Sequence, residues 1–176
     1  MKLEDAKTPI AKITQLKLKN RRRELAFLRR GPRLENALNC LSVVSEFVYP
    51  KSVDDLSACA EVLSSFVAGD CETGQLGFGR AMSLLVADSP SSDIRVSRVL
   101  SAQNIVELQA QLRPILTLMR SKGITPDYAQ LLADVATFTA EAWRSNIVAR
   151  WSLGYYRGMR AEKGQMNDAE PIGEAA

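Results

Sequence analysis

Apolar residues recur every three or four positions along most of the chain, which is the spacing of one buried helix face. Alternating runs of the kind that predict β-strands are scarce. The pattern therefore predicts an all-α fold with no sheet. The expected helices cover residues 10–19, 20–30, 34–48, 53–68, 78–87, 94–101, 104–121, 127–139 and 141–160.

Glycine, proline and serine mark where several of these helices should begin or end. Gly31-Pro32 is expected to end the second helix, because glycine frees the backbone and proline cannot donate to a helix ladder. Ser52 is expected to cap the fourth helix, and Gly69 to follow its end. Pro114 is expected to kink or divide the helix that contains it, because it removes one backbone donor.

Three apolar stripes are expected to contribute to the core. The first consists of Leu34, Leu38, Leu41, Val44 and Val48. The second consists of Ile105, Leu108, Leu112, Ile115, Leu116 and Met119. The third consists of Trp143, Ile147, Trp151 and Tyr155, one turn apart on the last helix.

The polar cluster at residues 88–93 is a candidate boundary between two lobes. We therefore expect two small helical bundles in one chain. The N-terminal lobe covers residues 1–87 and has a basic N-terminal segment, and the C-terminal lobe covers residues 92–160. Residues 164–176 are polar and acidic, and they are expected to form a disordered tail.

Composition argues against an enzyme. The chain has no histidine, which removes the commonest general base and the commonest transition-metal ligand. Cys40, Cys59 and Cys71 are odd in number and form no CxxC pair, so buried free thiols are expected. The acids show no metal-site spacing, and we predict no metal and no cofactor. Neither a membrane helix nor a secretory signal is evident, so a cytoplasmic location is expected.

Charge is distributed unevenly, although the net charge is only +3. Residues 1–33 contain 11 lysines or arginines and 3 acids. Residues 34–93 contain 2 basic residues and 9 acids, and residues 94–163 contain 10 basic residues and 5 acids. Two basic regions thus flank an acidic one. Folding is expected to gather a basic surface on one side and to leave an acidic surface for a protein neighbour.

Several arginines have a spacing that suits a polyanion backbone. A basic stripe opposite an apolar stripe can hold phosphates, and such contacts position a strand without reading its bases. The same residues are also typical of a solvated helix face, or of a helix end where they offset free carbonyls. The candidate nucleic-acid-binding residues are Arg29, Arg30, Arg33, Arg80, Arg95, Arg98, Arg113, Arg120, Lys122, Arg144, Arg150 and Arg157.

Two further features each leave two interpretations open. The glycine-rich segment at residues 74–80 lacks the Lys-Ser/Thr of a phosphate loop. Either Arg80 and free amides at a helix start contact one phosphate, or the segment is a tight turn between packed helices. A set of aromatic residues can either stack on bases or, as their helical spacing favours, lie in the core. This set is Trp143, Trp151, Tyr155 and Tyr156.

Three stretches resemble the CasB family, the small subunit of the type I-E CRISPR Cascade surveillance complex. They are NRRRELAFLRR at residues 20–30, LGFGRAM at residues 76–82, and residues 95–156, which include LQAQLRPILTLMRSKGITPDYAQLLADV and ARWSLGYY. The resemblance implies a non-catalytic helical subunit that helps to hold guide RNA and target DNA and stabilises the displaced strand. Implied partners are other Cascade subunits, another copy of the chain, guide RNA and target DNA, with no membrane and no small-molecule substrate.

Carried over by position, the resemblance marks seven strand contacts: Arg30, Arg80, Arg95, Arg98, Arg113, Arg144 and Arg150. Some relatives carry further basic residues where this chain has Ser101, Asn104 and Pro114. Two other classes of protein remain open on the sequence. One is a free-standing helical DNA-binding regulator, which would bind a defined duplex sequence. The other is a helical adaptor with no nucleic-acid role, whose arginines pair with acids.

Overall fold

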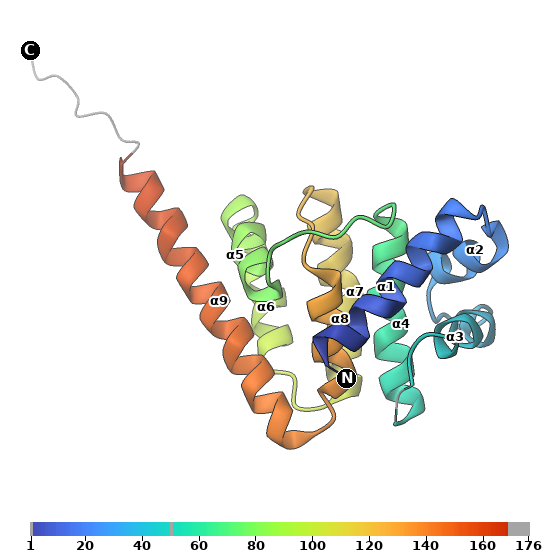
Figure 1. Ribbon diagram of the computed structural model, residues 1–176. Coiled ribbons are helices and arrows are strands. Elements are labelled where there is room, and N and C mark those ends of the chain that lie inside the picture. Colours follow the sequence, from blue (N-terminus) through green and yellow to red (C-terminus); the bar gives the residue numbers. More distant parts are fainter. Residues whose placement is uncertain (1, 50, 169–176) are drawn as a thin grey trace, which may run out of the picture.

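The computed structural model describes residues 2–49 and 51–168, and the regular structure in these ranges is helical (Figure 1). The expected all-α class is confirmed. The helices are α1 (Leu3–Leu18), α2 (Arg22–Arg30), α3 (Ala37–Ser45), α4 (Val53–Ala68), α5 (Phe78–Asp88), α6 (Asp93–Leu100), α7 (Ile105–Ser121), α8 (Tyr128–Thr137) and α9 (Glu141–Asp168), with a 3₁₀ turn at Pro90–Ser92. None of the helices in the described ranges is long and apolar enough to span a bilayer.

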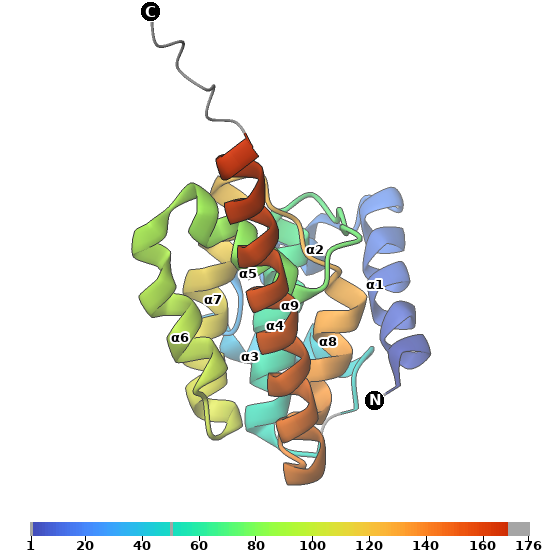
Figure 2. The same cartoon turned by 90° about the vertical axis from the view of Figure 1, so that its left-hand side faces the viewer.

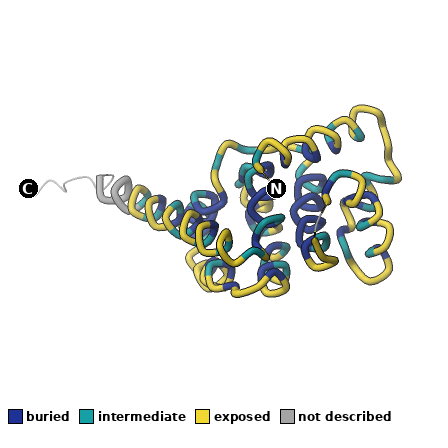
Figure 3. Tube along the Cα trace, turned by 60° about the horizontal axis from the view of Figure 1, so that its bottom comes forward, coloured by how far each residue is buried: buried dark blue, intermediate teal, exposed yellow. Residues whose placement is uncertain are grey.

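Helix α4 lies at the centre of the core. Every residue from Ala58 to Val67 is buried, because α4 packs on α7 and α8 on one side and on α2 and α3 on the other. Helix α1 lies across α8, and the helices α2 and α3 form one end of the molecule (Figure 1). Buried segments accordingly run along the inner helices, while exposed segments follow the outer edges (Figure 3).

Helix α9 packs along α5, and its C-terminal part extends beyond the other helices (Figures 1 and 2). Small residues allow this close contact: a Cβ at Gly79 would lie 2.1 Å from the carbonyl oxygen of Trp151. The Trp151 indole meets Phe78 edge-on, with ring centroids 4.9 Å apart, and stacks on Phe138. The Tyr155 hydroxyl donates to the Asp93 carboxylate at 2.7 Å, which ties α9 to α6.

The predicted caps of α4 are confirmed. The Ser52 hydroxyl accepts a hydrogen bond from the Asp55 amide at 3.1 Å, and Gly69 follows α4 as its C-cap. The core stripe of α7 is buried throughout, as expected. Pro114, however, does not divide α7. Pro114 and Ala110 are both exposed, so water can satisfy the carbonyl that loses its partner.

The predicted extents of three helices were wrong. Helix α1 begins at Leu3 rather than near residue 10 and accommodates Pro9 inside it. Helix α3 covers only Ala37–Ser45, and α9 continues to Asp168 instead of ending near residue 160. Residues 164–168 of the predicted tail therefore belong to α9, and residues 169–176 lie outside the described residues.

The apolar stripe predicted for α3 is confirmed only in its second half. Val44 and Val48 are buried, and Leu41 is partly buried against the core. Leu34 and Leu38 were predicted wrongly: they are 100% and 86% exposed, because residues 31–36 form a turn. Cys40 and Val43 are buried as well.

Helices on both sides of the predicted lobe boundary share one hydrophobic core. The boundary region contains the 3₁₀ turn between α5 and α6. Helix α4, before it, packs on α7 and α8, and α5 packs on α9. The division into residues 1–87 and 92–160 stays a prediction. The three cysteines are free thiols, with Cys40 and Cys59 buried and Cys71 partly so, which confirms the expectation for the first two.

Candidate nucleic-acid interface

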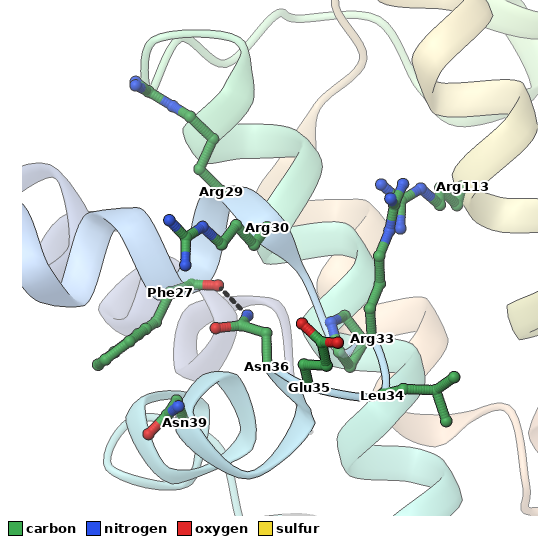
Figure 4. Close-up of a pocket in the computed structure, with 10 residues that line it drawn as sticks. Phe27, Arg29, Arg30, Arg33, Leu34, Glu35, Asn36, Asn39 and Arg113 are labelled. Carbon is green, nitrogen blue, oxygen red and sulfur yellow. Dashed lines mark hydrogen bonds between the residues drawn. The ribbon is translucent and has the colours of Figure 1, made fainter.

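A hollow of about 1030 Å³ lies where α2 ends and α3 begins (Figure 4). Its wall combines the end of α2, the turn that follows and one arginine of α7. The side chains of Arg33 and Arg113 extend toward one another from the turn and from α7 (Figure 4). The hollow is lined by Phe27, Arg29, Arg30, Pro32, Arg33, Leu34, Glu35, Asn36, Asn39 and Arg113.

The turn that carries Arg33 is held by several local contacts. Gly31 has a φ of 74°, in the left-handed region that favours glycine. The Asn36 side-chain amide is buried and donates to the carbonyls of Phe27 and Gly31, each at 2.8 Å. A Cβ at Gly31 would lie 2.9 Å from the Ser64 hydroxyl, so the turn packs directly on α4. These contacts fix the backbone from which the arginines project.

Two smaller hollows adjoin the first, and Arg113 lines all three. One, of about 50 Å³, is lined by Arg29, Glu61, Ser64, Ser65, Ala68, Arg113, Thr117 and Arg120. The other, of about 350 Å³, is lined by Arg95, Arg113, Pro114, Thr117, Leu118 and Ser121. We call this continuous surface the arginine groove, after Arg29, Arg30, Arg33, Arg95, Arg113 and Arg120.

Most of the positive charge in the arginine groove has no ion-pair partner among the described residues. Among the described residues, only Arg29 of the six arginines forms an ion pair, and its partner Asp70 is exposed and 3.7 Å away. Unpaired guanidinium groups in a concave surface attract polyanions, and their planar donor forks match phosphate oxygens. The groove thus has the chemistry of a backbone-binding site.

One buried acid interrupts this basic surface. Glu61 of α4 is only 8% exposed. Its carboxylate forms no hydrogen bond and no ion pair with any of the described residues. Burial raises the pKa of the Glu61 carboxyl above its ordinary value, and the nearby charge of Arg33 offsets part of that rise. Burial and the neighbouring Glu61 in turn raise the pKa of the Cys40 thiol to about 12.

Sequence analysis missed Glu61, although the chain carries a signal for it. Glu61 is the single charged residue between Leu56 and Gly69, in a helix that is otherwise apolar or small. An acid at the centre of such a run is expected to be buried, and buried acids without a partner are unusual. The turn residues Asn36 and Asn39 were also missed, because their roles depend on backbone geometry.

Glu61→Gln is expected to raise the thermal unfolding midpoint at neutral pH. Because the folded-state pKa of Glu61 lies above its ordinary value of 4.5, the folded chain binds more protons between the two values and loses stability as pH rises through that window. Glutamine stays neutral, so the gain should be on the order of 1 kcal/mol at neutral pH. Circular dichroism melts at neutral pH and near pH 4.5 test this: an equal gain at both would contradict it.

Four of the predicted cations lie outside the arginine groove and form ion pairs. Arg80 pairs with Glu162 at 2.7 Å, and Lys122 pairs with Asp88 at 2.8 Å. Arg144 lies 3.9 Å from Glu141. Arg150 pairs with Asp134, a buried carboxylate that also accepts from the Trp151 indole. The exposed Arg98 and Arg157 line none of the three hollows. Six of the twelve candidates therefore come together in one surface.

The glycine-rich segment fits the packed-turn interpretation. The Gly74 amide donates to the Pro126 carbonyl at 3.0 Å, and a Cβ at Gly74 would lie 1.9 Å from the Thr125 carbonyl oxygen. Arg80, the last residue of this segment, donates hydrogen bonds to Glu162 and Ser83. Close approach of two backbones therefore accounts for the glycine here.

The aromatic residues of α9 divide between core and surface. Trp151 and Tyr155 are buried, as their spacing favoured. Trp143 and Tyr156 are each 60% exposed, so the expectation that Trp143 faces the core was wrong. Trp143 lies in the first turn of α9, where it lines an open hollow shared with α1 and α8.

Comparison with known proteins identifies the family. The family model for the CRISPR-associated protein Cse2 matches residues 24–156. The chain belongs to this family. The matched residues include all of the second and third resembling stretches and most of the first, which confirms the resemblance. No curated protein matches the sequence of this Cse2-family chain.

Two solved structures share the fold of this Cse2-family chain. A chain of a CRISPR RNA-guided surveillance complex aligns with a TM-score of 0.71 at 20% identity, covering 93% of this chain and 98% of that one. CasB from Thermobifida fusca aligns with a TM-score of 0.60 at 21% identity, covering 86% and 95%. At such low identity these likenesses establish the helical fold.

Proposed function

We propose that this Cse2-family chain is a non-catalytic small subunit of a type I-E CRISPR Cascade complex in the cytoplasm, and that its arginine groove binds nucleic-acid backbones. The observation that carries the proposal is the convergence of five arginines from α2, its following turn, α6 and α7 around Arg113. Family membership and the fold shared with a surveillance-complex chain support it. Partners are then other Cascade subunits, a further copy of the chain, guide RNA and target DNA.

The groove suits backbone contacts better than base reading. Its charged donors are arginines, which bind phosphate through two parallel hydrogen bonds. In RNA-guided systems, base pairing reads the sequence and the protein holds the strands. A subunit with this groove would stabilise guide RNA–target DNA pairing and the displaced strand in antiviral defence. This role needs no cofactor and no catalytic group.

The test is recovery of a tagged chain from its native host at moderate salt, followed by mass spectrometry and RNA sequencing. We expect a large assembly that contains other CRISPR proteins and short guide RNAs. The matched control is the same chain with Arg33 and Arg113 replaced by alanine, which should still join the protein assembly. Recovery of the chain alone, or with one promoter fragment, would indicate an adaptor or a regulator instead.

Strand binding by the purified chain is expected to be weak, independent of sequence and strongly dependent on salt. For single strands, each neutralised phosphate contributes about −0.7 to the slope of log affinity against log salt, so three to four contacts predict a slope near −2 to −3. Fluorescence anisotropy with oligonucleotides of unrelated sequence measures both properties. A flat salt dependence would favour the adaptor, whereas tight binding of one duplex sequence would favour the regulator.

A further inference from the structure

Glu61 forms part of the wall of the smallest hollow in the arginine groove, together with three arginines. Arg29 of α2 and Arg113 and Arg120 of α7 line the same hollow. The charge of Arg33 in the turn is near enough to offset part of the rise in the Glu61 pKa, and Glu61 in turn helps to raise the pKa of the Cys40 thiol of α3. The other groups that α4 contributes to this hollow are Ser64, Ser65 and Ala68, none of which carries charge. Glu35, an exposed acid, lies in the neighbouring hollow.

The carboxylate thus shares its hollow with three arginines and forms no ion pair to any of them among the described residues. An acid whose only role was to neutralise the groove would be expected to contact a guanidinium directly. Glu61 instead lies below the surface and leaves the arginine donors open to a ligand. A phosphate held by Arg29, Arg113 and Arg120 would then lie opposite a second negative charge.

We propose that Glu61 couples strand binding in the arginine groove to protonation, so that the carboxyl takes up a proton when a backbone phosphate is bound beside it. This inference rests on the proposed function of the groove. Two negative charges in a partly buried site repel each other, and the repulsion ends when one of them is protonated. Because coupling between two ligands is reciprocal, bound phosphate favours protonated Glu61 and protonation favours phosphate binding. Affinity is therefore higher at lower pH.

The raised pKa of free Glu61 brings this coupling toward mildly acidic pH. The chain has no histidine that would titrate in the same range, and arginine stays charged throughout. At neutral pH the ionised Glu61 lowers the affinity of the arginine groove for a strand.

The experiment measures the affinity of the full chain for a 5′-unphosphorylated oligothymidine at constant ionic strength, from about pH 7.5 to about pH 5.5. Thymine does not titrate in this range, so a change in affinity reports on the protein. We expect the affinity to rise roughly fivefold as pH falls, which is the lower end of usual coupling between two sites. Glu61→Gln should bind at pH 7.5 with the higher affinity and show a nearly flat profile.

Glu4→Gln is the matched control. Glu4 is exposed on α1, pairs with Lys7 at 2.8 Å and lines none of the three hollows, so this variant has the same charge change elsewhere. It should reproduce the wild-type pH profile. Calorimetry of wild-type binding in two buffers of different ionisation enthalpy provides a second readout that needs no variant. We expect net proton uptake on binding at about pH 6.

The outcomes separate this inference from the proposed function. If the wild-type chain binds the oligonucleotide with no pH dependence and no proton uptake, the role of Glu61 is overturned and the groove stands. If Glu61→Gln keeps the wild-type profile, the role of Glu61 is likewise overturned. If the wild-type chain binds no strand at low salt at any of these pH values, the proposed function falls and this inference falls with it.

Discussion

Arg33→Ala combined with Arg113→Ala is expected to weaken binding of a single-stranded oligonucleotide by at least roughly tenfold while leaving the fold intact. The two guanidinium groups extend toward one another from different elements, and Arg113 lines all three hollows (Figure 4). A hydrogen bond to a charged group contributes about 1.5–3 kcal/mol, so loss of even one such contact lowers the affinity by roughly tenfold or more. Neither arginine forms an ion pair among the described residues, so the helices should not depend on them.

The control for this pair is Arg22→Ala combined with Arg23→Ala. It removes the same charge from the exposed N-terminal half of α2, at positions that line none of the three hollows. We expect this control to weaken binding only slightly, through the general attraction between a basic surface and a polyanion. The Arg33/Arg113 variant should also reduce the magnitude of the salt slope by about 1.4, the value for two single-strand phosphate contacts. Equal losses in the two variants would show that the groove has no special role.

The sequence predicted the helical class and many of the residues of the groove, but not the groove itself. Arg29, Arg30 and Arg33 could be found because they cluster at a Gly-Pro break, which the structure places at the end of α2. Their meeting with Arg113 depends on how α4 separates α2 from α7, and that geometry arises from side-chain packing across the core. No spacing rule along the chain contains this information.

The ion pairs could not be predicted from the sequence either. Arg80 and Glu162 are 82 residues apart, and they meet because α9 folds back along α5. The same folding brings Asp93 to Tyr155. A basic residue with the right helical spacing can therefore be a strand contact or half of a structural pair, and only the tertiary fold distinguishes the two. For Glu61, its isolation in an apolar run indicates burial but does not indicate which arginines share its hollow.

Gly79→Ala is expected to lower the free energy of unfolding by about 3 kcal/mol, at the upper end of the range for overpacked cores. In an isolated helix this change would be favourable, because alanine has the higher helix propensity. In α5, however, the added Cβ would lie 2.1 Å from the Trp151 carbonyl oxygen and 3.0 Å from the Tyr155 amide nitrogen. Both contacts are backbone atoms of α9, so the whole helix must shift.

The matched control is Gly77→Ala, two residues earlier. Gly77 has a φ of −56°, and a Cβ there would have nothing within 4 Å, so we expect a change within about 0.5 kcal/mol. Urea unfolding followed by circular dichroism, with intrinsic fluorescence from Trp143 and Trp151 as a second probe, measures both variants. If α9 shifts, Gly79→Ala should expose the Trp151 indole, which now packs between Phe78 and Phe138. Equal stability of the two variants would show that the close contact of α5 and α9 does not position the C-terminal helix.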